Sequence, residues 1–230
     1  MGDINAIFKS YDIRGLYPQE IDEEVCRNIG YAFAKFLLEE DPQATKIIVG
    51  VDMRLSSESL SDQFIKGILA LGLDVIHLGL SSTDMLYYAS GSLGAPGAIF
   101  TASHNPAEYN GIKLCRAHAA PIGEGSGLER IKSLANTVTE IPDESNGAVT
   151  HFDLLEGFTE HILSFVKPEV ITGKKIVADT ANGMGGLIVP SVFAQIPSEV
   201  DILYGELDGS FPNHPCLLYT SDAADDCWSV

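Results

Sequence analysis

Residues 101–113, TASHNPAEYNGIK, bring a serine hydroxyl, a histidine imidazole and a lysine ammonium group into one short polar stretch. Ala102 and Ser103 are small, so a phosphoryl group on Ser103 could approach the backbone closely. Backbone N–H groups in a strand-to-helix loop bind phosphate oxygens. Lys113 would add a point charge from the strand that follows. These residue types would suit a loop that holds a phosphoryl group.

A helix cap is the plainer interpretation of the same stretch. Ser103 and Asn105 have side chains suited to helix N-termini, and Pro106 is tolerated at the first helical position. His104 directly follows Ser103, so in regular structure the two side chains would point apart. Only an irregular loop would bring both to one reacting atom. Composition alone leaves the two interpretations open.

Two other segments are weaker candidates for a site. In YDIRG, residues 11–15, Arg14 precedes a glycine that permits an unusual backbone angle, but taken alone Arg14 fits a surface charge better. The glycine-rich turn NGMGG, residues 182–186, resembles a dinucleotide-binding fingerprint, yet Ile188 occupies the position of its third glycine. We therefore expect a tight left-handed turn there.

Alternating helices and strands must position these segments. Apolar residues at helical spacing and helix-start signals predict helices at 22–40, 56–72, 83–88 and 124–134. Short apolar runs predict strands at 46–51, 73–79, 97–101 and 111–115. This alternation predicts an α/β fold with a mixed, mostly parallel sheet and helices on both faces. Ser103 would then lie just beyond the carboxyl end of a strand, where such sheets bind ligands.

The chain is predicted to contain two α/β units. Residues 1–140 form the first domain, and the polar stretch that follows serves as a linker at 141–150. Residues 151–215 repeat the strand–helix pattern but are short for a full domain. Their expected elements are a helix, a strand, a helix and a strand, at 151–166, 174–179, 185–195 and 199–204.

Composition excludes some partners and compartments. Fourteen Lys and Arg residues stand against 32 Asp and Glu residues, for a net charge of −18, which argues against nucleic acid or an anionic membrane surface as a partner. No run of eighteen apolar residues occurs, and the amino terminus does not resemble a secretory signal. We expect a cytoplasmic protein whose four cysteines are free thiols. The sequence does not indicate an oligomeric state.

Five segments, in this order, resemble the bacterial phosphomannomutase/phosphoglucomutase branch of the α-D-phosphohexomutases. They are FKSYDIRG (8–15), VDMRLSS (51–57), TASHNPAEYNGIK (101–113), DTANGMGG (179–186) and DGSFPNH (208–214). The serine-loop segment is the most specific of them, and the resemblance covers about residues 1–215. It implies the first domain of that family and part of the second.

The resemblance also implies a reaction and roles for the site residues. Ser103 would carry the transferable phosphoryl group, and that phosphate would ligate Mg²⁺. Arg14 and Lys113 would surround the reacting centre, and His104 would support acid–base work or orientation. Tyr11 would brace the Arg14 segment and help to bind substrate. The reaction would interconvert hexose 6-phosphate and hexose 1-phosphate, of mannose or glucose, through a hexose bisphosphate. A serine phosphate carries about −1.5 to −2 charges, which explains the need for a metal and nearby cations.

The end of the chain departs from the family. The D-G-D-x-D-R metal loop, with its aspartate ligands, does not follow Pro215. We expect residues 216–230 to be a non-native tail, because 216–226 resemble a translated adapter used in DNA library preparation. We expect the parent protein to be a mutase and the chain as written to have negligible mutase activity, because catalysis needs all parts of the site together. The alternatives are a non-catalytic phosphosugar-binding module and a dinucleotide-binding α/β domain.

Overall fold

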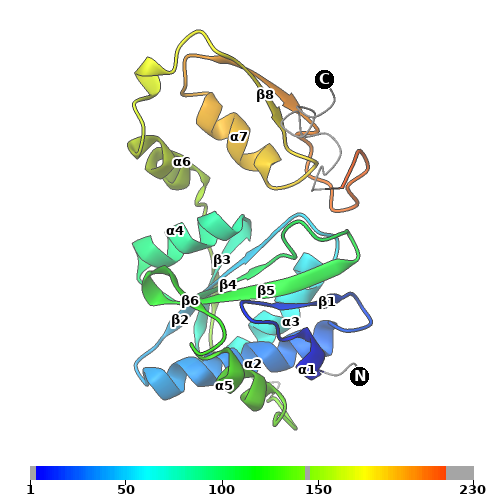
Figure 1. The fold of residues 1–230 in the computed structure, drawn as a ribbon. Coiled ribbons are helices and arrows are strands. Elements are labelled where there is room, and N and C mark those ends of the chain that lie inside the picture. The colour runs from blue at the N-terminus through cyan, green and yellow to red at the C-terminus, as the bar shows by residue number, and fades with distance from the viewer. Residues whose placement is uncertain (1–3, 143–145, 216–230) are drawn as a thin grey trace.

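A computed structural model describes residues 4–142 and 146–215, which form two α/β units one after the other along the chain (Figure 1). The larger sheet has seven strands in the order β1-β5-β4-β2-β3-β7, with β6 paired to β5. Strands β2, β3, β4 and β7 pair in parallel, whereas β5 is antiparallel to its neighbours β1, β4 and β6. The predicted mixed sheet is confirmed. The strands are β1 (Ile13–Leu16), β2 (Lys46–Val51), β3 (Asp74–Leu80), β4 (Gly97–Phe100), β5 (Tyr109–Arg116), β6 (Ala120–Ile122) and β7 (Val149–His151).

Helices cover both faces of this sheet, as predicted (Figure 1). One face carries α1 (Ile4–Ile7), α2 (Glu23–Glu40), α3 (Ser57–Leu69) and α5 (Leu128–Ala135), and the other carries α4 (Thr83–Leu93). The prediction for α4 was too short, because its buried face continues through Ala89 and Ser90 to a left-handed cap at Gly94. The prediction for α5 began too early, because Gly125 and Gly127 adopt positive φ angles that interrupt a helix.

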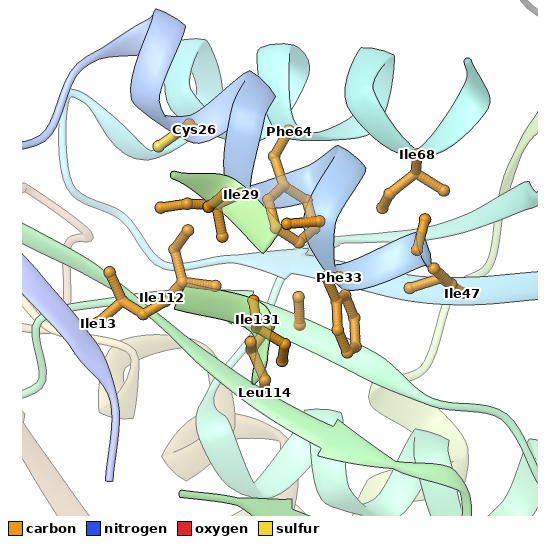
Figure 2. Close-up of a cluster of buried hydrophobic side chains, with 14 of the residues drawn as sticks. Ile13, Cys26, Ile29, Phe33, Ile47, Phe64, Ile68, Ile112, Leu114 and Ile131 are labelled. Atoms are coloured by element: carbon orange, nitrogen blue, oxygen red, sulfur yellow. The ribbon is translucent and has the colours of Figure 1, made fainter. Parts of the chain in front are cut away.

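The larger core lies between the sheet and the helices α2, α3 and α5. Phe33 and Phe64 both lie there (Figure 2), with tilted rings whose centroids are 6.2 Å apart, and Phe64 meets Phe100 of β4 edge-on at 5.3 Å. Helices α2 and α3 approach closely because Gly30 has no side chain: a Cβ at this position would lie 2.1 Å from the backbone oxygen of Phe64. This packed layer supports β2 and β4, from whose ends the candidate site extends.

The predicted linker at 141–150 is wrong at its carboxyl end. Val149 and Thr150 begin strand β7, which extends the large sheet beside β3 and brings His151 opposite His77. The Asp74 carboxylate accepts a hydrogen bond from the N–H of Ala148 at 2.8 Å, which guides the chain to this edge. Residues 143–145 lie outside the described part of the chain. The boundaries at 1–140 and 151–215 stay predictions.

The second unit contains the predicted order of helix, strand, helix and strand. These elements are α6 (Leu155–Ser164), β8 (Lys175–Asp179), α7 (Gly185–Phe193) and β9 (Glu199–Leu203), with β8 and β9 parallel. Two short 3₁₀ turns occupy Ala117–Ala119 and Pro168–Val170. Helix α6 begins at Leu155 rather than at 151, because residue 151 still belongs to β7.

The left-handed turn expected at 182–186 has its positive φ angles at Ala181 and Asn182. Gly186 serves a different purpose. A Cβ there would lie 2.1 Å from the backbone oxygen of Gly205, so a glycine is needed for the close contact.

The structure describes the state of two of the four cysteines and the character of the helices. Cys26 and Cys115 are buried free thiols, and burial raises the pKa of both. Cys216 and Cys227 lie outside the described residues. Across 4–142 and 146–215, none of the helices has the length and apolar character needed to cross a membrane.

Candidate functional site

The serine loop, residues 101–108, joins β4 directly to the antiparallel strand β5. No helix begins at Pro106, so the helix-cap interpretation is wrong, and the loop is not a strand-to-helix connection. The loop is held by short-range bonds: the N–H of Ser103 donates to Thr101 Oγ1 at 2.9 Å, and Asn105 Nδ2 donates to the carbonyl of Ala102 at 2.8 Å. Ser103 is exposed and has a φ of 55°, a left-handed conformation that costs energy for a residue with a Cβ.

This irregular backbone brings two adjacent side chains together. Ser103 Oγ lies 3.3 Å from His104 Nδ1, which the sequence analysis allowed only in an irregular loop. The two side chains are exposed, so a substrate can reach them. An imidazole at this distance can accept the serine proton, or orient the hydroxyl toward an incoming phosphorus atom.

Arg14 and Lys113 are linked by a carboxylate that the sequence analysis did not single out. Arg14 on β1 and Lys113 on β5 both contact Asp12 Oδ2, at 3.1 and 3.2 Å. Asp12 is only 8% exposed. Arg14 is thus a partly exposed charge, with 31% of its side chain accessible, that is also tied into an ion pair. Two cations share one carboxylate, which leaves a net positive charge for an anion such as a phosphate.

Tyr11 does not act as expected on the Arg14 segment. Its side chain is 80% exposed, so it does not brace that segment by burial against it. A part in substrate binding stays a prediction for Tyr11. The segment is held instead by the pairing of β1 with β5, which sets Arg14 opposite Gly111.

Arg54 is the second residue that sequence analysis missed. It follows β2, is 3% exposed, and its guanidinium donates four hydrogen bonds to carbonyls of the serine loop and the start of β5. Nη1 bonds the carbonyls of Pro106 and Tyr109 at 2.7 and 3.0 Å. Nη2 bonds those of Ser103 and Asn105 at 2.9 and 2.6 Å. A planar fork of N–H donors suits such a cluster, which lysine could not replace.

Asp52 orients Arg54. Its Oδ2 lies 3.2 Å from Arg54 Nε, and its Oδ1 accepts hydrogen bonds from the N–H of Arg54 and from Ser57 Oγ, at 3.0 and 2.6 Å. Asn110 Nδ2 ties the start of β5 to the same segment through Ser57 Oγ at 3.0 Å. The segment VDMRLSS was noted as a motif, but its place beside the serine loop depends on β2 and β4 being neighbours in the sheet.

The described residues offer few metal ligands. In 4–142 and 146–215, no three His, Cys, Asp or Glu side chains are grouped closely enough to hold a metal ion. Asp12 and Asp52 are occupied by ion pairs with the cations named above. Within this part of the chain, a metal at the serine loop would depend on a phosphate on Ser103.

The glycine-rich turn does not present a dinucleotide site. Asn182 Nδ2 donates to the carbonyl of Glu206 at 3.0 Å, and its Oδ1 accepts from Asn213 Nδ2 at 2.7 Å, so this polar side chain is used within the second unit. Its role there is to hold the chain that follows β9. The dinucleotide-binding alternative is not favoured.

The fold and sequence are similar to those of hexose phosphate mutases. Residues 5–141 match the family model described as phosphoglucomutase/phosphomannomutase, alpha/beta/alpha domain I. A phosphomannomutase of Vibrio cholerae is 36% identical over 212 residues, which cover 90% of this chain and 46% of the relative. A protein of Xanthomonas campestris named phosphohexose mutases is 37% identical over 220 residues, which cover 94% of this chain and 48% of the relative.

Solved structures agree. A Burkholderia thailandensis phosphoglucomutase/phosphomannomutase family protein superposes with a TM-score of 0.80 at 29% identity, over 94% of this chain and 47% of the other. A putative phosphomannomutase from Thermus thermophilus gives 0.77 at 25% identity, over 92% and 48%. The chain spans about half the length of the relatives it matches. Because the family model matches more than half of the chain, the chain belongs to the phosphoglucomutase/phosphomannomutase family.

Proposed function

We propose that this chain provides the phosphoserine-bearing part of a mutase that interconverts hexose 6-phosphate and hexose 1-phosphate. One observation carries the proposal: the exposed hydroxyl of Ser103 lies 3.3 Å from His104 Nδ1, on a loop whose carbonyls are held by a buried arginine. Family membership and the names of the relatives support hexose phosphates as the substrate class.

In the proposed reaction, Ser103 Oγ attacks a phosphorus atom of a hexose bisphosphate. The Oγ–P bond forms while the bond between phosphorus and the sugar oxygen breaks. His104 Nδ1, unprotonated in the appropriate tautomer, takes the serine proton, and the released sugar oxygen takes up a proton. The reverse step on O1 or O6 of a hexose phosphate restores the bisphosphate and the free serine. Each transfer needs alignment and charge neutralisation more than covalent catalysis.

In this proposal Arg14 and Lys113 would supply positive charge to the reacting centre. They lie on the strands β1 and β5, and β5 directly follows the serine loop. Because Asp12 holds both side chains, they are positioned before substrate binds, which lowers the cost of reorganisation during transfer. Asp12 is therefore part of the proposed site although it would not contact the phosphoryl group itself.

Membership of the family implies a metal cofactor, and we propose Mg²⁺. A phosphate on Ser103 would supply oxygen ligands, which Mg²⁺ prefers. When bound, the ion would neutralise charge on the transferred group. We also propose a cytoplasmic setting and no nucleic-acid or membrane partner; the net charge of −18 supports the second of these.

Phosphorylation of Ser103 tests the proposal. We expect the chain, incubated with glucose 1,6-bisphosphate and Mg²⁺, to gain the mass of one phosphoryl group that peptide mapping assigns to Ser103. Ser103→Ala should abolish the gain, whereas Ser92→Ala, which alters another exposed serine on α4, should leave it unchanged. A wild-type chain that binds the sugar but stays unmodified would instead favour a non-catalytic phosphosugar-binding module. A phosphate gained by Ser103→Ala would place the acceptor elsewhere.

A further inference from the structure

The second unit contacts the residues that hold the serine loop. The docking loop, residues 208–214, follows β9 and packs on the segment after β2. Gly209 is buried there: a Cβ at this position would lie 2.6 Å from both Arg54 Cα and the carbonyl oxygen of Met53. Backbone therefore touches backbone, and only glycine fits without displacing one of the two loops.

Phe211 of the docking loop lies against the guanidinium of Arg54. The distance from Arg54 Cζ to the ring centroid is 5.2 Å, within the range of a cation–π contact. Phe211 has a φ of 51°, which is rare for a bulky residue and persists only where surrounding contacts impose it. Because the Arg54 side chain is shielded from water, the attraction between ring and cation is weakly screened.

The docking loop is fixed to the second unit at both ends. The N–H of Asp208 donates to the carbonyl of Asn182 at 3.0 Å, near its start. Near its end, Asn213 Nδ2 bonds Asn182 Oδ1 at 2.7 Å, and His214 Nε2 lies 3.0 Å from Asp179 Oδ2 at the end of β8. The loop that carries Phe211 is therefore anchored in the second unit at both ends, and between them it packs on the first unit.

We propose that Phe211 is a positioning residue for Ser103 and that it acts through Arg54. The ring packs on the guanidinium, and the guanidinium bonds the carbonyls of the serine loop, Ser103 included. Through these contacts the second unit sets the geometry of the Ser103 hydroxyl. The consequence for phosphoryl transfer rests on the proposed function, whereas the physical coupling does not.

Hydrogen exchange of the serine loop tests the coupling directly. Asn105 N–H, bonded to the carbonyl of Ala102 at 3.1 Å, reports on loop opening. We expect Phe211→Ala to speed exchange of the loop amides roughly tenfold, from loss of the cation–π and packing contact. Phe211→Tyr, which keeps the ring, should exchange like the wild type. Phe165→Ala is the matched control, since that ring is 74% exposed and meets His161 edge-on instead. Wild-type exchange in Phe211→Ala would overturn the proposal.

The rate of Ser103 phosphorylation separates positioning from mere contact. With glucose 1,6-bisphosphate we expect Phe211→Ala to lower the maximal rate roughly tenfold with little change in KM, because alignment is lost and substrate binding is not. Phe211→Tyr should restore the rate. Fast exchange combined with a wild-type rate would overturn the positioning role. If the wild type takes up no phosphate, the proposed function fails, and the exchange data alone decide the coupling.

A second substitution covers the case in which Phe211→Ala does not fold. Phe211→Leu keeps apolar bulk but removes the face of the ring, and we expect exchange of the loop amides roughly threefold faster than in the wild type. Equal exchange in Phe211→Leu and the wild type would remove the cation–π contact from the proposal.

Discussion

The two units of this chain both alternate strands with helices, but their strands are buried to different extents. Strand β2 of the first unit, KIIVGV, has buried residues at five of its six positions. Strand β8 of the second unit, KIVAD, has none, and its side chains alternate between exposed and half-buried. Both strands are in parallel pairings, but β2 lies between two parallel neighbours under helices on both faces, whereas β8 pairs only with β9 among the described residues.

The difference shows that the burial of a strand depends on the layers packed around it and not only on its own residues. A parallel strand becomes a core strand when helices cover both faces and other strands cover both edges. The first unit meets that condition and carries the serine loop on it. The second unit meets this condition in part. It contacts the candidate site through the docking loop, which packs on Arg54 of the first unit.

We expect the greatest difference in stability between the two units when one phenylalanine is removed from each. Phe64→Ala should cost about 3–5 kcal/mol of stability, because it opens a cavity in a fully buried, close-packed cluster. Phe193→Ala on the half-buried face of α7 should cost about 1 kcal/mol or less, since only part of its area leaves water. Urea unfolding, with hydrogen exchange reporting on each unit, gives both values. Equal costs would mean that the second unit packs as firmly as the first.

Two glycines with the same steric demand, one in each unit, allow a second comparison of how firmly the units are packed. A Cβ at Gly30 or at Gly186 would lie 2.1 Å from a backbone oxygen, of Phe64 and Gly205 respectively. We expect Gly30→Ala to cost about 1–3 kcal/mol, because the packed helices α2 and α3 resist separation. Gly186→Ala should cost less, because the partner lies in an irregular segment after β9 that can move.

Gly91→Ala on α4 is the control for helix propensity. A Cβ there meets nothing within 4 Å, so alanine should stabilise the helix by about 0.5–1 kcal/mol. Thermal unfolding of the three variants measures the order. A larger loss for Gly186→Ala than for Gly30→Ala would contradict the expected rigidity of the first unit.

We expect smaller effects of pH on stability, with opposite signs in the two units. Burial, and then the nearby His151, lowers the pKa of His77 below 6.5, against weaker opposing effects of Asp62 and Glu58. The unfolded chain then binds more protons below about pH 6.5, so stability of the first unit is lost as the pH falls. His77→Asn can still accept the bond that Gly79 N–H makes to Nδ1 at 3.1 Å, and should flatten this slope.

His214 should behave in the opposite sense. The hydrogen bond to the carbonyl of Pro215, and then Asp179, raise the pKa of His214 above 6.5. Its contribution is therefore fully present below about pH 6.5 and is lost as the pH rises through the raised value. Unfolding of each unit between pH 5 and pH 8, compared with His77→Asn and His214→Gln, measures both slopes. Slopes of the same sign would show that other groups control the pH response.

Most elements could be predicted from the residues, and the failures have local causes. The helix at 22–40 and the strand at 46–51 were strongly periodic and proved accurate to within a residue. The linker prediction failed at Val149 because a three-residue edge strand has no periodicity to detect. The helix-cap alternative at Pro106, which the residues left open, is wrong because cap residues and turn residues are the same types, and pairing of β5 with β4 decided between them.

The residue types alone made the serine loop a candidate for phosphate handling, since hydroxyl, imidazole and ammonium groups lie within one stretch of chain. How that loop is held depends on contacts between residues far apart in the sequence. Asp12 joins Arg14 to Lys113 because β1 pairs with β5, and Arg54 reaches four carbonyls because β2 lies beside β4. Phe211 reaches Arg54 across the two units. Residues distant in sequence meet through strand order and layer packing, which the local pattern of residue types does not encode.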